Sequence, residues 1–321
     1  MRSHVILLDG TLSNLKFERE TSIGLIYKLL KPGSHELTVY YRPGLQWGNW
    51  KSNLAVLTGQ GLSNQIKEAY GALASRYEYG DNIFFFGYSR GAFSVRAISG
   101  MINEVGLLKK KYSTERNVSN VWRLYHKRKV NQHFSKHLCH ANVDIQFIGV
   151  LDTVAPLGLS IPLVRKYFER YYKFYNNSVC PNVKNAFHAL SIDEARAAYS
   201  PEYWDLGNIP ENTKAKQVWF RGVHGDIGGQ IGDVKSARQL SNIPLVWLLD
   251  NADRSGLSLP SDWKLNFPTN PKAISSKRFS WINIFSLFNT KRRINLSKHE
   301  WIHESVSPVF PQKQKAQRDF R

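Results

Sequence analysis

One stretch decides the fold: Asn82 to Gly91, which reads Asn-Ile-Phe-Phe-Phe-Gly-Tyr-Ser-Arg-Gly. Its apolar part, residues 83–86, is aromatic and β-branched throughout, which is typical of a strand buried on both faces of a parallel sheet. Apolar residues then recur at the spacing of one helical face, at Ile98, Met101, Ile102 and Val105. The sequence therefore predicts a strand-to-helix junction at residues 87–91.

Residues 87–91 also match the Gly-x-Ser-x-Gly motif. A sharp turn between a strand and a helix lifts a serine hydroxyl above the sheet, which makes Ser89 the candidate nucleophile. Gly87 and Gly91 leave room where side chains would clash with the turn and the neighbouring strand. The start of the helix adds free N–H groups, including that of Arg90, for a developing oxyanion. The alternative is an ordinary turn serine.

Strand and helix patterns alternate through the first third of the chain. Buried-strand patterns occupy Val5–Leu8 and Leu37–Tyr41, and helical patterns occupy Glu18–Leu30 and Gln65–Tyr77. This alternation predicts an α/β fold, a parallel sheet with helices on both faces. Later patterns predict strands over Asp144–Leu151 and Gln217–Val223 and helices over Leu245–Ala252 and Asn185–Ala198, the last with a structural Asp193–Arg196 pair.

Two predicted strands end in an acidic motif. Asp9-Gly10-Thr11 follows the first strand, at the sheet edge where open α/β folds bind ligands, so Gly10 and Thr11 are candidates for the second oxyanion donor. Asp152 follows the strand after the nucleophile strand, where a hydroxyl–imidazole pair finds its orienting carboxylate. For both Asp9 and Asp152 the alternative is a turn or capping role.

A glycine-rich loop holds the candidate histidine. His224 follows a clear strand and precedes Gly225, Gly228 and Gly229, which let the backbone approach closely and leave the imidazole free to swing over the sheet edge. We predict that His224 is the catalytic base, with a purely structural histidine as the alternative.

Length and composition favour one large α/β domain over two smaller ones. The 321 residues predict a domain over 1–311 with helical, basic insertions at about 107–142 and 159–210, a helix or lid near Leu159–Ser178, and a basic tail at 312–321. No apolar run is long enough to cross a bilayer or act as a signal peptide, so we expect a cytoplasmic protein unless a specialised secretion machine exports it. Two cysteines exclude a disulfide framework.

The charge balance points to anionic partners. A formal net charge of +19 and the clusters at 109–111, 127–129 and 291–293 favour peripheral contact with anionic membranes, or else a simply solubilising surface. Four histidines in the basic region 107–142 lack carboxylates or cysteines at ligand spacing, so we expect a solvated helical face there and neither a metal nor a cofactor.

Several motifs together resemble one family. They are Leu8-Asp9-Gly10-Thr11, Tyr41-Arg42-Pro43-Gly44, Gly87 to Phe93, Gly149 to Val154, His188-Ala189-Leu190 with Asp193-Glu194-x-Arg196, Trp219 to Gly229, and His303 to Val306. This set resembles DUF2235, an α/β-hydrolase family that includes the Tle1-like phospholipase effectors of the bacterial type VI secretion system. The resemblance implies an α/β-hydrolase-like sheet, mainly parallel, with helical cap insertions.

The resemblance also implies a serine esterase or lipase that acts on phospholipids or other lipid or small esters. By matching motif, Ser89 is the nucleophile, His224 the base and Asp152 the orienting acid. Asp226 and Asp9 are alternative acids. His303 is an alternative base, because in many hydrolases of this class the histidine lies late in the chain.

Two other functions stay open from the sequence. One is a binding module on a hydrolase scaffold that recognises anionic lipid or nucleic acid without catalysis, although no specific nucleic acid is expected. The other is a metal-dependent phosphoesterase built on Asp9, Asp152, His224 and Asp226.

Overall fold

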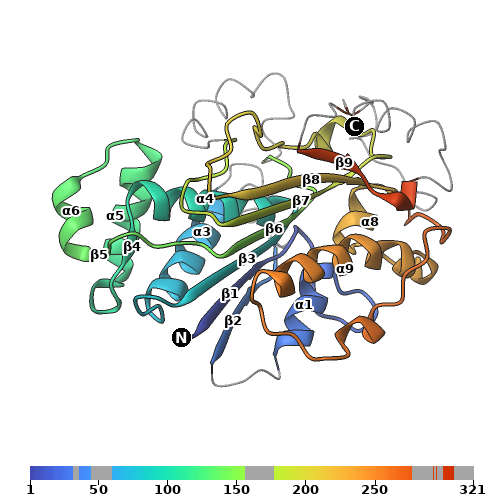
Figure 1. Cartoon of the computed structure of the whole chain (residues 1–321), viewed down its shortest axis with the longest axis horizontal. Coiled ribbons are helices and arrows are strands. Elements are labelled where there is room, and N and C mark those ends of the chain that lie inside the picture. Colours follow the sequence, from blue (N-terminus) through green and yellow to red (C-terminus); the bar gives the residue numbers. More distant parts are fainter. Residues whose placement is uncertain are drawn as a thin grey trace.

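In the described part of the chain, seven strands form a parallel sheet at the centre of the molecule (Figure 1). The computed structural model describes residues 1–31, 36–44, 60–155, 177–276, 292, 294 and 299–306. In sheet order β2-β1-β3-β6-β7-β8-β9, all neighbours pair in parallel. The strands span Ser3–Leu8 (β1), Leu37–Arg42 (β2), Asn82–Tyr88 (β3), Phe147–Leu151 (β6), Asn185–Ser191 (β7), Lys214–Phe220 (β8) and Glu300–Ile302 (β9). The α/β architecture predicted from the sequence is confirmed.

Helices cover both faces of the sheet. The main helices are α1 (Ser22–Leu30), α3 (Gln60–Ala74), α4 (Arg90–Glu104), α5 (Glu115–His126), α8 (His224–Gly228) and α9 (Arg238–Arg254). Side chains of β3 alternate between two buried clusters. Ile83 and Phe85 pack with α3 and α4, whereas Phe84 and Phe86 pack with α1 and α9. The wholly apolar run at 83–86 is therefore buried on both faces, as predicted.

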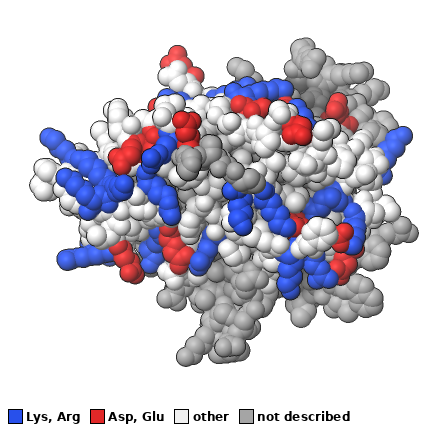
Figure 2. All heavy atoms as spheres, turned by 90° about the horizontal axis from the view of Figure 1, so that it is seen from below, with Lys and Arg blue, Asp and Glu red and all other residues white. Residues whose placement is uncertain are grey.

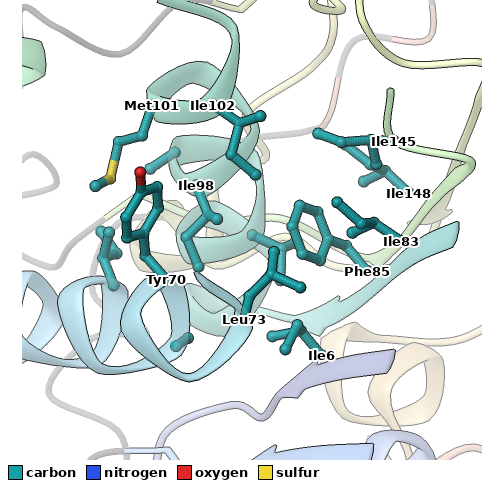
Figure 3. Close-up of a cluster of buried hydrophobic side chains, with 14 of the residues drawn as sticks. Ile6, Tyr70, Leu73, Ile83, Phe85, Ile98, Met101, Ile102, Ile145 and Ile148 are labelled. Carbon is teal, nitrogen blue, oxygen red and sulfur yellow. The ribbon is translucent and has the colours of Figure 1, made fainter. Parts of the chain in front are cut away.

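The face under α3 and α4 shows how tightly the nucleophile strand is held. Leu73 of α3 and Ile98 of α4 meet Phe85 of the sheet in Figure 3. All three are fully or almost fully buried. Burial of a side chain of this size contributes about 1.5–3 kcal/mol, so this packing fixes both β3 and α4 on either side of the turn that carries Ser89.

One predicted helix is a strand. Residues 185–191 form β7, buried in the middle of the sheet, rather than the start of a helix over Asn185–Ala198. The predicted insertion at about 159–210 therefore includes part of the sheet. Most of the predicted lid and the whole tail at 312–321 lie outside the described residues.

The basic region lies at the end of the sheet opposite Ser89. It contains the two-stranded pair β4 (Leu107–Leu108) and β5 (Cys139–His140), helix α5 and helix α6 (Gln132–Leu138). Its His140 ring lies 5.1 Å from that of Tyr77, which precedes β3, whereas Ser89 follows β3. Lys and Arg side chains gather there in Figure 2; the exposed ones are Lys110, Lys111, Arg116, Arg123, Lys127, Arg128, Lys129 and Lys136.

Short 3-10 helices complete the described chain. They span Lys110–Tyr112 (η1), Ala197–Tyr199 (η3), Lys235–Ala237 (η4), Trp263–Asn266 (η5) and Glu304–Val306 (η8). Across the described part of the chain, no helix combines the length and the apolar character needed to span a bilayer.

Candidate active site

Ser89 occupies a strained turn between β3 and α4. Its backbone has φ 57° and ψ −121°, a conformation that side-chain-bearing residues rarely adopt. A Cβ at Gly91 would lie 2.1 Å from the carbonyl oxygen of Leu8, and one at Gly87 would lie 2.6 Å from Cα of Ala92. The two glycines thus make the steric room that the motif predicts, and the turn holds the serine at the carboxyl edge of the sheet.

His224 lies between Ser89 and Asp152. Its Nε2 is 3.0 Å from Ser89 Oγ, and its Nδ1 is 2.6 Å from Asp152 Oδ2. All three side chains are buried or nearly so. His224 is the first residue of the short helix α8, which is capped after Gly228 by Gly229 with φ 78°, so it is held by helical structure rather than by the flexible loop predicted from the glycines.

Asp152 is surrounded by hydrogen-bond donors. Its Oδ1 accepts from the Ser191 N–H at 3.0 Å and from Arg292 Nη1, and its Oδ2 accepts from Arg292 Nη2 at 2.9 Å as well as from His224. Burial alone would raise the pKa of Asp152, but the charge of Arg292 and these hydrogen bonds outweigh it and hold the pKa well below its ordinary value. The carboxylate therefore stays ionised beside the imidazole.

Two aromatic rings and one carboxylate fix the orientation of His224. The Tyr88 and Tyr199 rings lie 4.9 and 4.6 Å from the imidazole, centroid to centroid. Glu194 Oε2 accepts a hydrogen bond from the His224 backbone N–H at 3.1 Å. Glu194 also pairs with Arg196, whose guanidinium lies 4.2 Å from the Tyr199 ring centroid. The ion pair within this motif joins residues 194 and 196, so the predicted Asp193–Arg196 pair is wrong.

The predicted oxyanion donors lie close to Ser89 but are not equivalent. Arg90 is the first residue of α4, next to the nucleophile. A Cβ at Gly10 would lie 3.4 Å from Ser89 Cβ, so this backbone approaches the serine closely. The Gly10 N–H, however, donates to Asp9 Oδ1 at 2.7 Å. The Gly10 N–H group is therefore already occupied in this structure.

Comparison with known proteins identifies the family. The model of the family described as "T6SS, Phospholipase effector Tle1-like, catalytic domain" matches residues 2–251. The chain belongs to the Tle1-like phospholipase catalytic-domain family. The matched range contains Ser89, Asp152 and His224, and it ends before Arg292.

Two individual proteins are also similar. An uncharacterized protein of Saccharomyces cerevisiae is 29% identical over 225 residues, which cover 61% of this chain and 31% of the yeast protein. A crystal structure of an uncharacterized protein from Pseudomonas aeruginosa aligns with a TM-score of 0.49 and 14% identity, over 87% of this chain and 50% of that one. This Tle1-like chain thus spans half or less of the length of either relative.

The alternative acids have other partners in this Tle1-like domain. Asp9 accepts hydrogen bonds from Gly10, Thr21 and Tyr41, and burial nevertheless raises its pKa to about 6. Asp226 accepts from the Val223 N–H and from residues 275 and 276. Neither carboxylate has a hydrogen bond to His224 among the described contacts. Within the described ranges, no group of three or more His, Cys, Asp or Glu side chains is arranged to hold a metal ion.

The alternative base His303 lies elsewhere. It follows β9, an edge strand too short to be evident in the sequence. Its ring stacks on Phe220 at 4.5 Å between centroids, and its Nδ1 accepts from the Ser305 N–H. Burial lowers its pKa. In the described structure it is His224, not His303, that bonds to Ser89.

Sequence reasoning missed Arg292 in the site. A run of three basic residues such as Lys291-Arg292-Arg293 predicts exposed charge, yet the Arg292 side chain is only 4% exposed and bonds to Asp152. Nothing in a run of three basic residues indicates which one turns inward. The motif Asp193-Glu194-x-Arg196 predicts that its charged residues pair with each other. It does not predict that Glu194 contacts His224.

Proposed function

We propose that this Tle1-like domain hydrolyses carboxylic esters with Ser89 as nucleophile, His224 as general base and Asp152 as the acid that orients the imidazole. The observation that carries the proposal is the position of His224, with one ring nitrogen 3.0 Å from Ser89 Oγ and the other 2.6 Å from the Asp152 carboxylate. Both distances lie within the range for proton transfer between a catalytic serine, histidine and carboxylate.

The chemistry follows from these contacts. Ser89 Oγ attacks the ester carbonyl as its proton moves to His224 Nε2, and the N–H groups of Arg90 and Thr11 stabilise the oxyanion. His224 then donates that proton to the leaving alcohol, and an acyl group stays on Ser89. A water molecule, deprotonated by His224, releases the acid and restores the hydroxyl. Asp152 stays ionised throughout and stabilises the imidazolium.

We propose phospholipids as the substrates. The family name describes phospholipase effectors, and a net charge of +19 concentrates anionic lipids around the molecule. Delivery to another cell by a type VI secretion system stays a proposal of the same kind, since it rests on the family alone.

A fluorophosphonate probe tests the nucleophile. We expect the purified chain to be labelled on Ser89, with labelling abolished in Ser89→Ala and strongly reduced in His224→Ala. Ser94→Ala is a matched control, because Ser94 lies on α4 and its hydroxyl bonds to a backbone carbonyl; labelling should persist there. Label on another residue, or full ester turnover by Ser89→Ala, would overturn the proposal.

Mass spectrometry of products tests the substrate. The chain is incubated with vesicles of phosphatidylglycerol and phosphatidylethanolamine, and released fatty acid and lysophospholipid are quantified against Ser89→Ala. Turnover of short soluble esters without any release from vesicles would contradict the phospholipid proposal while leaving the triad in place.

A second candidate function is binding to an anionic surface through the basic end of the molecule. The exposed Lys and Arg side chains around α5 and α6 favour it (Figure 2). Because that end is opposite Ser89, this binding would hold the protein at a membrane without presenting the catalytic edge. Salt-sensitive sedimentation of Ser89→Ala with anionic vesicles, lost when Lys127, Arg128 and Lys129 become Gln, is the expected result; unchanged sedimentation would exclude this surface.

A further inference from the structure

Arg292 forms a two-pronged contact with the candidate catalytic acid. Its two terminal nitrogens bond to the two oxygens of Asp152, at 2.5 Å for Nη1–Oδ1 and 2.9 Å for Nη2–Oδ2. The same nitrogens donate to the backbone carbonyls of Ser191 at 3.0 Å and Tyr199 at 2.7 Å. A planar guanidinium held at both ends in this way fixes the plane of the carboxylate as well as its charge.

We propose that Arg292 is a positioning residue for the catalytic acid, supplied by a segment beyond the family-matched range 2–251. This inference rests on the proposed function, because it assigns Arg292 a part in the triad. The residue does not contact Ser89 or the reacting atoms. It acts through Asp152, whose oxygens it shares with His224 and Ser191.

Charge compensation is the first reason for the assignment. Asp152 is completely buried, and an isolated carboxylate at such a position would be neutralised by a proton instead of staying ionised. The Asp152 carboxylate accepts four hydrogen bonds, two of them from Arg292. Without Arg292, only the Ser191 N–H and the His224 ring would remain as donors. The ionised state of Asp152, and with it the favourable contact to the imidazolium, depends on the guanidinium.

Anchoring of the segment is the second reason. Ile294, two residues after Arg292, packs against a buried cluster that includes Leu190, Trp219 and Ile302. The edge strand β9 pairs with β8, and the His303 N–H donates to the carbonyl of Trp219 at 2.8 Å. Packing and sheet pairing thus hold the described parts of this C-terminal segment on the rim that carries Asp152 and His224.

A pH profile separates a positioning role from a purely structural one. The charged or titratable groups that face the Asp152–His224 pair, besides Arg292, are Tyr88, His188, Glu194, Arg196, Tyr199, Tyr203 and Asp9. Burial lowers the pKa of His188 to about 3 and raises that of Tyr203 to about 12. Asp9 titrates near 6 but is unchanged in the variants, so differences between variants report on the pair itself.

The loss of the Arg292 charge determines the direction in which the pH profile shifts. Without the positive guanidinium, Asp152 binds a proton more readily, since a positive neighbour opposes protonation of a carboxylate. The acid limb of kcat/KM therefore moves to higher pH in Arg292→Ala. We expect turnover to fall about tenfold to a hundredfold, by analogy with the loss of outer partners that orient metal ligands, and KM to change little because Arg292 does not contact the substrate.

The experiment compares Arg292→Ala and Arg292→Lys with a control. Lysine keeps the positive charge but cannot bond to both oxygens of Asp152 as the guanidinium does. Arg292→Lys should therefore retain the wild-type acid limb of the pH profile and have a reduced kcat. Arg221→Ala is the control, because Arg221 is also partly buried and donates to two backbone carbonyls, at Pro271 and Ala273. Its acid limb should stay in place. An unshifted limb in folded Arg292→Ala, or an equal shift in Arg221→Ala, would overturn the inference.

A measurement independent of turnover separates this inference from the proposed function. In protein labelled with carbon-13 aspartate, the carboxyl signal missing from Asp152→Ala identifies Asp152. Its titration should move to higher pH in Arg292→Ala even if no ester is hydrolysed. A shifted titration in a protein without esterase activity would overturn only the proposed function, whereas an unshifted titration in an active enzyme would overturn only the role of Arg292.

Discussion

The backbone N–H of His224 donates a hydrogen bond to the side chain of Glu194, 30 residues earlier in the chain. The two Glu194 oxygens also accept from the Ala195 and Arg196 N–H groups and from the Arg196 guanidinium. One buried carboxylate thus joins the loop after β7 to the start of α8. The orientation of the candidate base depends on a residue that takes no part in proton transfer.

Glu194→Gln tests this connection. The amide of glutamine keeps one accepting oxygen, but its NH2 group would face N–H donors that need an acceptor. We therefore expect the free energy of unfolding to fall by about 2 kcal/mol. kcat should fall with it, because α8 loses a contact at its first residue. Urea denaturation and ester turnover check this, with the exposed Glu211→Gln as control. An unchanged stability would contradict the role of this carboxylate.

Replacement of Ser89 should separate stability from activity. Glycine adopts the observed φ of 57° without the strain that any side chain suffers there. We expect Ser89→Gly to be about 1 kcal/mol more stable than Ser89→Ala, although both lose the nucleophile. Parallel urea denaturation of the two inactive variants measures the difference. Equal stability, or a more stable alanine variant, would mean that the turn is not strained.

Asp9 should make stability depend on pH. Its folded-state pKa of about 6 lies above the ordinary 3.8, so between pH 4 and 6 the folded protein binds more protons than the unfolded chain and stability falls as pH rises. The wild type should therefore lose about 2 kcal/mol relative to Asp9→Asn between pH 4 and pH 7. Urea denaturation of both proteins at the two pH values tests this; a constant difference would contradict it.

Two glycine-to-alanine changes should have opposite effects. A methyl group at Gly91 would meet the Leu8 carbonyl at 2.1 Å, which requires β1 or α4 to shift, so we expect a loss of at least about 2 kcal/mol. At Gly71, inside α3, a methyl would meet Val118 at an ordinary 3.4 Å. Gly71→Ala should gain about 0.5–1 kcal/mol from helix propensity. Thermal unfolding of both variants measures these two changes in stability.

Local patterns revealed most of the fold but misassigned one central strand. The run at 83–86 and the alternation around it identify β1, β2, β3 and their helices, because a buried parallel strand has a continuous apolar sequence. In β7, by contrast, two alanines and a leucine also suit a helix. Only the pairing of β7 with β6 and β8 determines its state, and that pairing is absent from a local pattern.

Part of the site could likewise be predicted from local patterns, and part could not. Ser89, Asp152 and His224 each follow a recognisable strand, so their convergence at one sheet edge could be expected from parallel topology. Arg292 could not be found, because its burial depends on a carboxylate 140 residues away. Nor could His303 be placed, since the three residues of β9 become a strand only through the neighbouring β8.

The same separation of 140 residues between Asp152 and Arg292 has a consequence for the protein during its own synthesis. At about 5 to 20 residues per second, a ribosome needs about 7 to 28 seconds to travel that length. Throughout that time the nascent chain carries its serine and its acid but lacks the arginine that, on our proposal, keeps the acid ionised. A lipid hydrolase built in this order would gain its full activity only after Arg292 has been synthesised, which limits the time in which a growing chain can attack the membranes of the cell that makes it.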